Sequence, residues 1–274
     1  MKTLIKSAFF LLALTLTNTT HAWTQRPVLP VQQCEQHSPY GFATTKSQLT
    51  PICRQAYLSA YDAAAKIPKY VSYTLEPKNA LGCVERTNAF VADASVPGGP
   101  TPDDYVGTGY DKGHAVPDGD LSWDQQVEYE SFLMTNMYPQ AGSLNRGIWK
   151  LLETSVRGWS VQLNSSYTIY VGAVYDNNDK KIGKNIVVPH GFYKIVVNNS
   201  TKEVAGWAFP HVPPYPNLGN DLIKFRMPIS QIESAADVKF GFPKGAVELS
   251  PGKEWPVNFG QLTTDKRKKC GKAD

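Results

Sequence analysis

The stretch LNRGIWKLLETSVRGW, residues 144–159, carries the clearest amphipathic helix pattern in the chain. At about 100° per residue, its apolar side chains fall on one stripe and its polar side chains step along the edge of that stripe. The stripe consists of Ile148, Leu152, Val156 and Trp159, and the edge of Asn145, Trp149, Glu153 and Arg157. The sequence therefore predicts a helix that presents three polar groups to a common site, with Trp149 packed as a core residue.

Two polar stretches precede this helix: DKGH at residues 111–114 and TNMYPQ at residues 135–140. Phosphodiester hydrolysis needs a base to activate water, a cation to stabilise the charge of the transition state, and a proton for the leaving oxygen. The three stretches supply an imidazole in His114, and an amide and a carboxylate for a cation in Asn145 and Glu153. We assign no catalytic role to His190 or His211, because each stands beside a proline in a predicted loop.

In this order, the three stretches resemble the DNA/RNA non-specific endonucleases of the ββα-metal (His-Me finger) superfamily. The pattern of that family is Asp-Arg-Gly-His, then Asn-x-x-Pro-Gln, then Leu-Asn-x-Gly-x-Trp, then Glu. The resemblance covers residues 70–245, and residues 170–175, 188–189 and 192–194 look like the later strands of the family. It implies an α+β fold, with a central antiparallel β-sheet flanked by helices and a ββα-metal finger active site.

The resemblance also implies roles for single residues. His114 would end a strand and take a proton from the attacking water as a neutral imidazole. Asn145 would be the only direct protein ligand of Mg²⁺, an ion that keeps several of its waters, and Glu153 would hold those waters. Mn²⁺ is the expected substitute. One of these waters would protonate the departing 3′ oxygen, so DNA and RNA would both be cut to 5′-phosphate ends, without strong sequence preference.

Three basic residues are candidates for phosphate contacts, which position a nucleic acid without reading its bases. Arg157 matches the arginine that contacts phosphate in the family, although a helix-surface salt bridge with Glu153 is the alternative. Arg86 is a further candidate, with an ordinary exposed arginine as its alternative. Lys112 departs from the pattern, because the family has arginine there; lysine keeps the charge but loses the planar, bidentate fork.

Two polar residues are candidates for a supporting role. Asn136 resembles the asparagine of the family that lies near the metal and the scissile phosphate, and we count it with the catalytic residues. The alternative is that Asn136 only satisfies backbone groups before the Pro-Gln turn. Asp111 is expected to orient the strand of the active site or its neighbours through hydrogen bonds, and its alternative is an acid that closes a local turn.

The N-terminus has the pattern of an export signal. Lys2 and Lys6 precede an apolar run at residues 8–16, and small residues flank a cleavable bond after Ala22. The run is too short to span a membrane, so we expect no anchor after processing. We assign residues 1–22 to the signal and residues 23–274 to a single domain, secreted or periplasmic. The formal charge of +4 does not by itself indicate a polyanionic partner.

All four cysteines lie in the exported part of the chain, where an oxidising environment favours disulfides. None has the close spacing of a zinc site. Four cysteines allow three pairings, and the sequence does not choose among them. The candidates are Cys34, Cys53, Cys83 and Cys270.

Local patterns outline the remaining elements. Residues 23–51 are expected to form an irregular arm and residues 96–102 a loop, because proline, glycine and polar residues dominate both. Helices are predicted at residues 52–66, from Ser122 to residue 134, and from Ser230 to residue 235. Strands are predicted at residues 70–75, 167–175, 192–197, 203–209 and 223–227, of which 192–197 and 203–209 form a hairpin.

Two other classes of function remain as alternatives. An exported nucleic-acid-binding protein could keep the nuclease fold without turnover, but a binder needs none of His114, Asn145 and Glu153. A disulfide-linked envelope protein with an accidental motif would show no activity that depends on a divalent metal.

Overall fold

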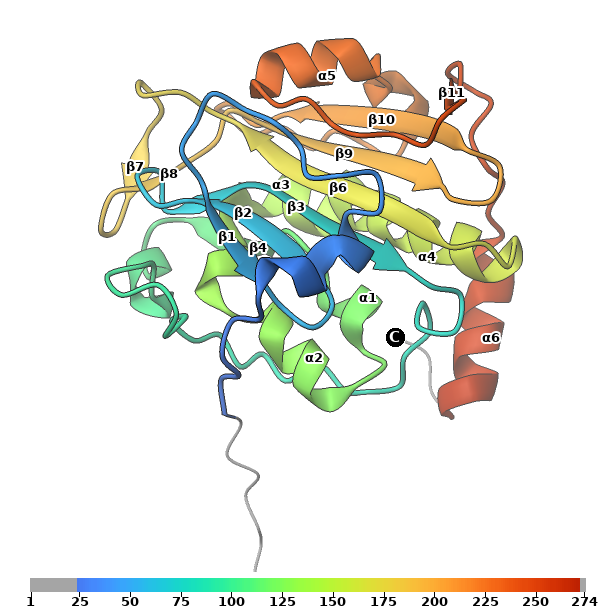
Figure 1. The fold of residues 1–274 in the computed structure, drawn as a ribbon, viewed down its shortest axis with the longest axis horizontal. Coiled ribbons are helices and arrows are strands. Elements are labelled where there is room, and N and C mark those ends of the chain that lie inside the picture. Colours follow the sequence, from blue (N-terminus) through green and yellow to red (C-terminus); the bar gives the residue numbers. More distant parts are fainter. Residues whose placement is uncertain (1–23, 272–274) are drawn as a thin grey trace, which may run out of the picture.

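A seven-stranded sheet forms the centre of the computed structural model, which describes residues 24–271. Figure 1 shows its strands side by side in the order β1-β2-β3-β6-β9-β10-β11. All neighbours are antiparallel except β10 and β11, so the expected antiparallel sheet is confirmed apart from one short edge strand. The strands are β1 (Thr50–Cys53), β2 (Leu58–Asp62), β3 (Ile67–Leu75), β6 (Tyr167–Val174), β9 (Gly191–Asn198), β10 (Glu203–Pro210) and β11 (Val247–Glu248).

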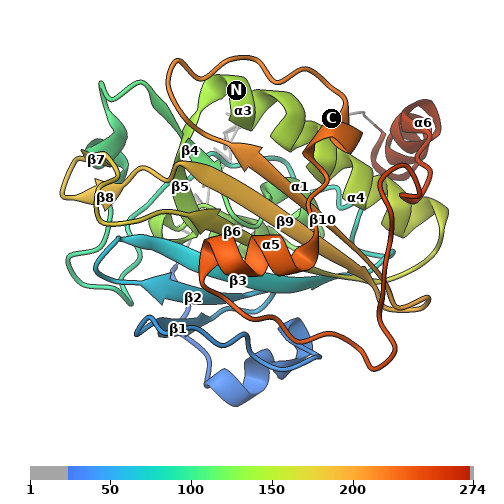
Figure 2. The ribbon, with the colours of Figure 1, turned by 90° about the horizontal axis from the view of Figure 1, so that it is seen from above.

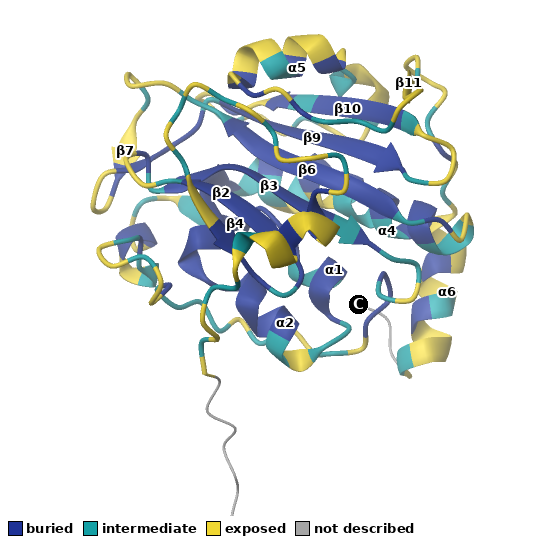
Figure 3. Ribbon diagram, in the orientation of Figure 1, coloured by how far each residue is buried: buried dark blue, intermediate teal, exposed yellow. Residues whose placement is uncertain are grey.

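Different helices cover the two faces of this sheet, as Figures 1 and 2 show from two sides. Helix α5 (Ile229–Ala236) packs on one face through Ile229 and Ile232, and helix α4 (Lys150–Gln162) packs on the other. Since successive side chains of a strand point to opposite faces, each strand contributes to both cores. Nearly all of the central strands are buried (Figure 3).

A second, two-stranded sheet leads into α4. Strands β4 (Tyr110–His114) and β5 (Met137–Ala141) pair antiparallel, with His114 opposite Met137. A Cβ atom at Gly113 would lie 2.0 Å from Oε1 of Gln140, so only glycine fits before the histidine. The chain then runs through α3 (Gly142–Leu144) and a π-helical turn (Asn145–Trp149) into α4, which completes the expected ββα arrangement.

The predicted helix at residues 144–159 is confirmed, with one interruption at Gly147, whose backbone is not helical. All four residues of the apolar stripe are buried. Trp149 is also buried, at 1% exposure, as expected of a core residue. The break at Gly147 separates Asn145 from the regular turns that carry Glu153 and Arg157.

The predicted helix at residues 52–66 is wrong, because this segment forms β1, β2 and a turn. The turn follows Asp62, whose Oδ1 accepts hydrogen bonds from the backbone N–H groups of Ala64 and Ala65 at 2.9 and 3.0 Å. Lys66 then adopts a left-handed backbone, with φ of 59°. Pairing with β3 outweighs the intrinsic helix preference of the alanines, which is a weak determinant of structure.

The predicted strand at residues 223–227 is also wrong. A 3₁₀ helix (Leu222–Phe225) lies there, and the Asp221 side chain caps it by accepting a hydrogen bond from the N–H of Ile223 at 3.2 Å. The predicted strands at 70–75 and 167–175 and the hairpin are confirmed as β3, β6 and β9–β10.

Helix α2 (Gln125–Ser131) is shorter than predicted and starts later than Ser122. Asp124 caps it instead, accepting hydrogen bonds from the N–H groups of Gln126 and Val127. Helix α1 (Asp118–Leu121) precedes α2, and a 3₁₀ helix (Met134–Asn136) follows α2. The predicted helix near residue 230 is confirmed as α5, which is preceded by Pro228. The other short elements are 3₁₀ helices Val31–His37 and Pro102–Tyr105, strands β7 (Lys181–Ile182) and β8 (Ile186–Val187), and helix α6 (Phe259–Cys270).

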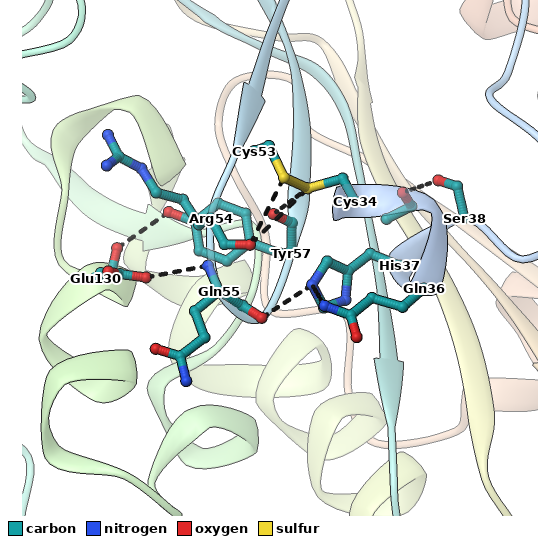
Figure 4. Close-up of a disulfide and its surroundings, with 10 residues drawn as sticks. Cys34, Gln36, His37, Ser38, Cys53, Arg54, Gln55, Tyr57 and Glu130 are labelled. Carbon is teal, nitrogen blue, oxygen red and sulfur yellow. Dashed lines mark hydrogen bonds between the residues drawn. A yellow bond between two sulfur atoms is a disulfide. The ribbon is translucent and has the colours of Figure 1, made fainter. Parts of the chain in front are cut away.

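Two disulfides use all four cysteines. Cys34–Cys53 joins the N-terminal arm to the edge of the sheet (Figure 4), and Cys83–Cys270 ties the end of α6 to the body of the protein. The arm expected at residues 23–51 is mostly irregular, but it contains one 3₁₀ helix and isolated β-bridges at Leu29 and Thr44, and strand β1 already begins at Thr50. Between residues 24 and 271, no helix has the length and apolar character needed to cross a membrane. The predicted export signal, residues 1–22, lies outside the described residues.

Candidate active site

A cleft of about 310 Å³ lies where the end of β4, helix α1 and the first turns of α4 meet. Its lining includes residues of two of the three predicted stretches, 111–114 and 144–159, and none of TNMYPQ. Basic side chains outnumber acidic ones in its lining, so the cleft favours an anionic ligand. The lining contains His114, Asn145 and Glu153, the basic residues Arg86, Lys112, Arg146, Lys150 and Arg157, and Asp118 beside Pro117 and Gly119.

His114 is the last residue of β4 and is 8% exposed. Its ring packs edge-on against Phe132, with centroids 4.9 Å apart, and lies near Phe90. Burial lowers the pKa of His114 to about 4, although Asp118 partly opposes this shift. The imidazole is therefore neutral at pH 7, and its buried Nε2 has no hydrogen-bond partner among the described residues.

Asn145 lies across the cleft in the π-helical turn. Its Nδ2 donates a hydrogen bond to Oδ2 of Asp111 at 3.0 Å, and Arg146 forms an ion pair with the same carboxylate. Because the amide nitrogen is held by Asp111, the orientation of the amide is fixed, and its oxygen accepts no hydrogen bond from residues 24–271. Asp111 thus orients a neighbour of the catalytic strand, in line with the role expected for it.

Glu153 projects from α4 and its side chain is 12% exposed. Burial raises the pKa of this carboxyl to about 7, while Lys194 and Arg157 act against that rise. The nearest cation is Nζ of Lys194, 3.8 Å from Oε1 of Glu153. The carboxylate oxygens accept no hydrogen bond from the part of the chain that the structure describes, so they can accept hydrogen bonds from water.

Arg157 lies one turn further along α4 and forms an ion pair with Asp120. Its NH1 is 2.8 Å from Oδ1 of Asp120, and the hydroxyl of Tyr73 donates to Oδ2 of the same carboxylate at 2.7 Å. Asp120 is 1% exposed. Arg157 thus reaches the cleft from a buried anchor, and its charge also acts on Glu153, where it opposes the rise in the pKa of that carboxyl.

Arg86 and Lys112 both lie at the cleft, as predicted. Arg86 forms an ion pair with Asp118, and its guanidinium stacks over Phe132 at 4.9 Å from the ring centroid. Nζ of Lys112 lies 4.8 Å from the centroid of Phe90. The two aromatic rings that carry these cations are the same two that pack against His114, so the cations and the imidazole share one support.

Asn136 does not line the cleft. It is fully buried, and its Oδ1 accepts a hydrogen bond from the N–H of Val116, while its Nδ2 donates to the carbonyl oxygens of Val116 and Ser131 at 3.0 and 2.8 Å. These bonds fix the turn that follows His114. This arrangement matches the backbone-satisfying alternative, so Asn136 is a positioning residue and its assignment among the groups that touch the substrate is not supported.

Sequence reasoning missed Asp118, Asp120, Arg146, Lys150 and Lys194. The two aspartates follow His114 closely, and the Asp-Gly-Asp spacing next to a motif histidine was a usable signal. Arg146 and Lys150 lie within the predicted helix, on the side of Asn145. Lys194 lies in the stretch at residues 192–194 that resembles a later strand of the family, but nothing in the sequence showed it to be buried at the site, because a lysine is ordinarily exposed.

The donor set of the cleft fits a hard divalent cation that keeps most of its waters. An amide oxygen and a carboxylate without hydrogen-bond donors face the same space, and oxygen ligands are those that Mg²⁺ prefers. Within the described residues, no group of three or more His, Cys, Asp or Glu side chains could enclose a metal. The fit is therefore to an ion with very few protein ligands.

Comparison with known proteins identifies the family. Residues 35–245 match the family model described as DNA/RNA non-specific endonuclease. The chain is 30% identical over 217 residues to "Nuclease 1, mitochondrial" of Schizosaccharomyces pombe, a match that covers 69% of this chain and 66% of the relative. It is 29% identical over 222 residues to "Nuclease" of Nostoc sp., which covers 74% of this chain and 78% of the relative.

A solved structure confirms the fold. A chain in the "Crystal structure of the EndoG/EndoGI complex: Mechanism of EndoG inhibition" superposes with a TM-score of 0.70 at 24% identity. The superposition covers 84% of this chain and 99% of that chain, so the α+β fold around the central sheet is common to both. Together with the family model, which matches more than half of the residues, these comparisons show that the chain belongs to the DNA/RNA non-specific endonuclease family of nucleases.

Proposed function

We propose that this protein is an exported, Mg²⁺-dependent endonuclease that hydrolyses the phosphodiester bonds of DNA and RNA and leaves 5′-phosphate ends. One observation carries the proposal: a neutral, buried imidazole lies in the same basic cleft as an oriented amide and a largely buried carboxylate. We treat residues 23–274 as one domain that contains this site.

His114 acts as the general base. Its imidazole is neutral at pH 7 because burial lowers its pKa, so it can accept a proton from the attacking water. The pairing of β4 with β5, and the close packing of Gly113 on Gln140, hold the end of the strand in place. The bonds of Asn136 to Val116 fix the turn directly after it.

Asn145 binds the metal directly through its amide oxygen, and Glu153 holds the waters of the ion. A bound Mg²⁺ supplies a Lewis acid that stabilises charge on the phosphate and acidifies water for the departing 3′ oxygen. Mn²⁺ substitutes for Mg²⁺, because both accept oxygen ligands of this kind. Asp111 fixes the orientation of this amide by accepting a hydrogen bond from its nitrogen, which would leave the oxygen available to the ion.

Arg157, Arg86 and Lys112 bind phosphate oxygens along the cleft. Arg157 keeps a planar fork there, whereas Lys112 contributes a point charge that fits phosphate less closely than arginine. Contacts to phosphate do not distinguish bases and do not require a 2′-hydroxyl. The proposal therefore includes both DNA and RNA as substrates, without strong sequence preference.

Export follows from the N-terminal sequence and agrees with the chemistry of the cysteines. Disulfides persist in oxidising compartments such as the periplasm and the extracellular medium. Both disulfides of this chain are formed between cysteines that lie after residue 22. The protein is therefore proposed to act outside the cytoplasm, in one of those two places.

The test uses the purified protein with supercoiled plasmid DNA and with a long RNA, in Mg²⁺ or in EDTA. We expect both polymers to be degraded in Mg²⁺ and neither in EDTA. His114→Ala should lose cleavage, and His37→Gln, at a histidine of equal burial outside the cleft, should keep it. Failure of the wild type to cut either polymer with metal present would favour a nucleic-acid-binding protein without turnover.

A further inference from the structure

Lys194, in the middle of β9, is a completely buried lysine that the mechanism above does not use. Its neighbours Tyr193 and Ile195 belong to the core under α5, so the Lys194 side chain points to the other face, toward α4. There its Nζ lies 3.8 Å from Oε1 of Glu153 and 4.8 Å from the centroid of the Trp149 ring. It makes no hydrogen bond within residues 24–271.

A buried ammonium without hydrogen bonds is costly, because water no longer solvates its charge. Two features reduce that cost here: the face of the Trp149 indole, which attracts cations, and the carboxylate of Glu153. The other nearby carboxylate, Asp120, already accepts hydrogen bonds from Arg157 and Tyr73. Glu153 is thus the carboxylate that balances Lys194.

The separation of 3.8 Å has a consequence for Glu153. An ordinary charge-assisted hydrogen bond is shorter, at about 2.7–2.9 Å, and occupies a lone pair of the carboxylate. At 3.8 Å, Lys194 supplies its charge without occupying that lone pair. The carboxylate stays in position on α4, with its oxygens available to the water that fills the cleft.

A purely structural ion pair elsewhere in the chain looks different. Arg54 and Asp93 are both about 1% exposed on their side chains, and NH2 of Arg54 lies 2.7 Å from both oxygens of Asp93. Ser95 and Thr135 also donate to that carboxylate. The carboxylate of Asp93 accepts hydrogen bonds from protein groups, whereas that of Glu153 accepts none from the described residues.

We propose that Lys194 is a positioning residue for metal binding: held between the Trp149 ring and Glu153, it keeps the Glu153 carboxylate in place on α4, so that Glu153 can bind the waters of the ion. The inference rests on the proposed function. The contact between Lys194 and Glu153 connects helix α4 to the central strand β9, so the sheet fixes the position of the carboxylate.

The test measures Mn²⁺ binding by calorimetry or by electron paramagnetic resonance, without nucleic acid. Lys194→Met removes the charge and keeps an unbranched apolar stem. We expect it to raise the Kd for Mn²⁺ by about 10- to 100-fold, the usual effect of losing a residue that supports a metal ligand. Lys194→Gln, which is also neutral, gives the same readout if Lys194→Met does not fold.

Lys69→Met is the matched control. Lys69 lies on β3 of the same sheet, is 6% exposed, and places its Nζ 4.3 Å from the centroid of the Tyr175 ring. It does not line the cleft. This variant should bind Mn²⁺ within about twofold of the wild type, which separates loss of a buried lysine in general from loss of this one.

Glu153→Gln completes the experiment. If Lys194 acts through Glu153, Lys194→Met should weaken Mn²⁺ binding little further in the Glu153→Gln background. Wild-type affinity in both neutral Lys194 variants, with Glu153→Gln impaired, would overturn the inference and leave the proposed function standing. A wild type that binds no Mn²⁺, or binds it independently of Glu153, would overturn the metal site of the proposed function and this inference with it.

Discussion

Two clefts of similar size flank helix α1, and each contains a buried histidine. The cleft around His114 measures about 310 Å³ and the one around His37 about 250 Å³. The two histidines are 8% and 7% exposed, and burial lowers the pKa of each to about 4. Burial and a lowered pKa therefore do not distinguish a catalytic histidine from a structural one in this protein.

The surroundings of the two rings do distinguish them. Nε2 of His37 lies 3.0 Å from the carbonyl oxygen of Gln55, a contact visible in Figure 4 beside the Cys34–Cys53 disulfide. The cleft of His37 has Lys78 as its one lysine or arginine in the lining, beside Glu76. The cleft of His114 has five lysine or arginine side chains, an oriented amide and a carboxylate without hydrogen-bond donors. Each ring keeps one buried nitrogen without a partner among the described residues, so what marks the site is the positive charge, the oriented amide and the carboxylate that accompany His114.

The first prediction compares the loss of an asparagine from each of the two clefts. Asn145→Ala removes the proposed direct metal ligand. Since a metal contributes several kcal/mol to such a reaction, we expect the rate of cleavage to fall by about 10²- to 10³-fold at millimolar Mg²⁺. Asn79→Ala, in the cleft of His37, should cleave at the wild-type rate. Initial rates of plasmid nicking measure both. Equal rates for the two variants would remove the distinction between the clefts.

The second prediction concerns stability. Arg157→Ala leaves Asp120 buried with Tyr73 as its remaining partner among those described above, so we expect the free energy of unfolding to fall by about 3–5 kcal/mol. Lys78→Ala, at an exposed position of the other cleft, should change it by less than about 0.5 kcal/mol. Urea denaturation measures both values. A small loss in Arg157→Ala would mean that Asp120 is not held by this pair.

The third prediction is the pH dependence of the His114 base. A base must be unprotonated, and burial lowers the pKa of His114 to about 4, well below the ordinary value of about 6.5. At pH 5.5 we expect the His114 ring to be almost entirely neutral, whereas a histidine with an ordinary pKa would be about one-tenth neutral. An NMR titration of the ring measures this apart from the Glu153 carboxyl, whose pKa burial raises to about 7. His37→Gln should follow the same profile as the wild type. A midpoint near pH 6.5 would show that burial does not control the base.

The smallest predicted effect concerns exposed charge. Lys150 lines the basic cleft from the start of α4, and we expect Lys150→Gln to raise KM for plasmid a few-fold at low salt, with little change in kcat. Lys78→Gln removes the same charge from the other cleft and should leave KM unchanged. A rise in KM of the same size in both variants would show that only the total charge of the protein matters.

The parts of the site that could be predicted lie close together in the sequence. Helical periodicity placed Asn145, Glu153 and Arg157 on one edge, and the structure brings all three to the cleft. A pattern of this kind is local, so it survives folding. The residues that balance these groups, Asp120 and Lys194, come from segments more than 30 residues away from their partners, where no periodic pattern links them.

The errors in the predicted fold have the same physical origin. The alanines at residues 63–65 favour a helix locally, but the Asp62 side chain closes a turn there and β2 pairs with β3. The segment at residues 223–227 has strand-forming residues but makes only an isolated bridge, between Trp207 and Arg226. In both cases an aspartate side chain fixes the local backbone, with strand pairing added in the first, and these contacts outweigh the propensity of the segment.

The central claim is that the cleft separates two tasks, with His114 activating water and Asn145 and Glu153 holding the metal. The most direct test measures Mn²⁺ affinity and plasmid cleavage on the same preparation of His114→Ala. We expect Mn²⁺ affinity within about twofold of the wild type, and cleavage reduced by about 10²- to 10⁴-fold, the contribution of a general base. Wild-type cleavage in this variant would contradict the role of the base, and loss of Mn²⁺ binding would make His114 part of the metal site.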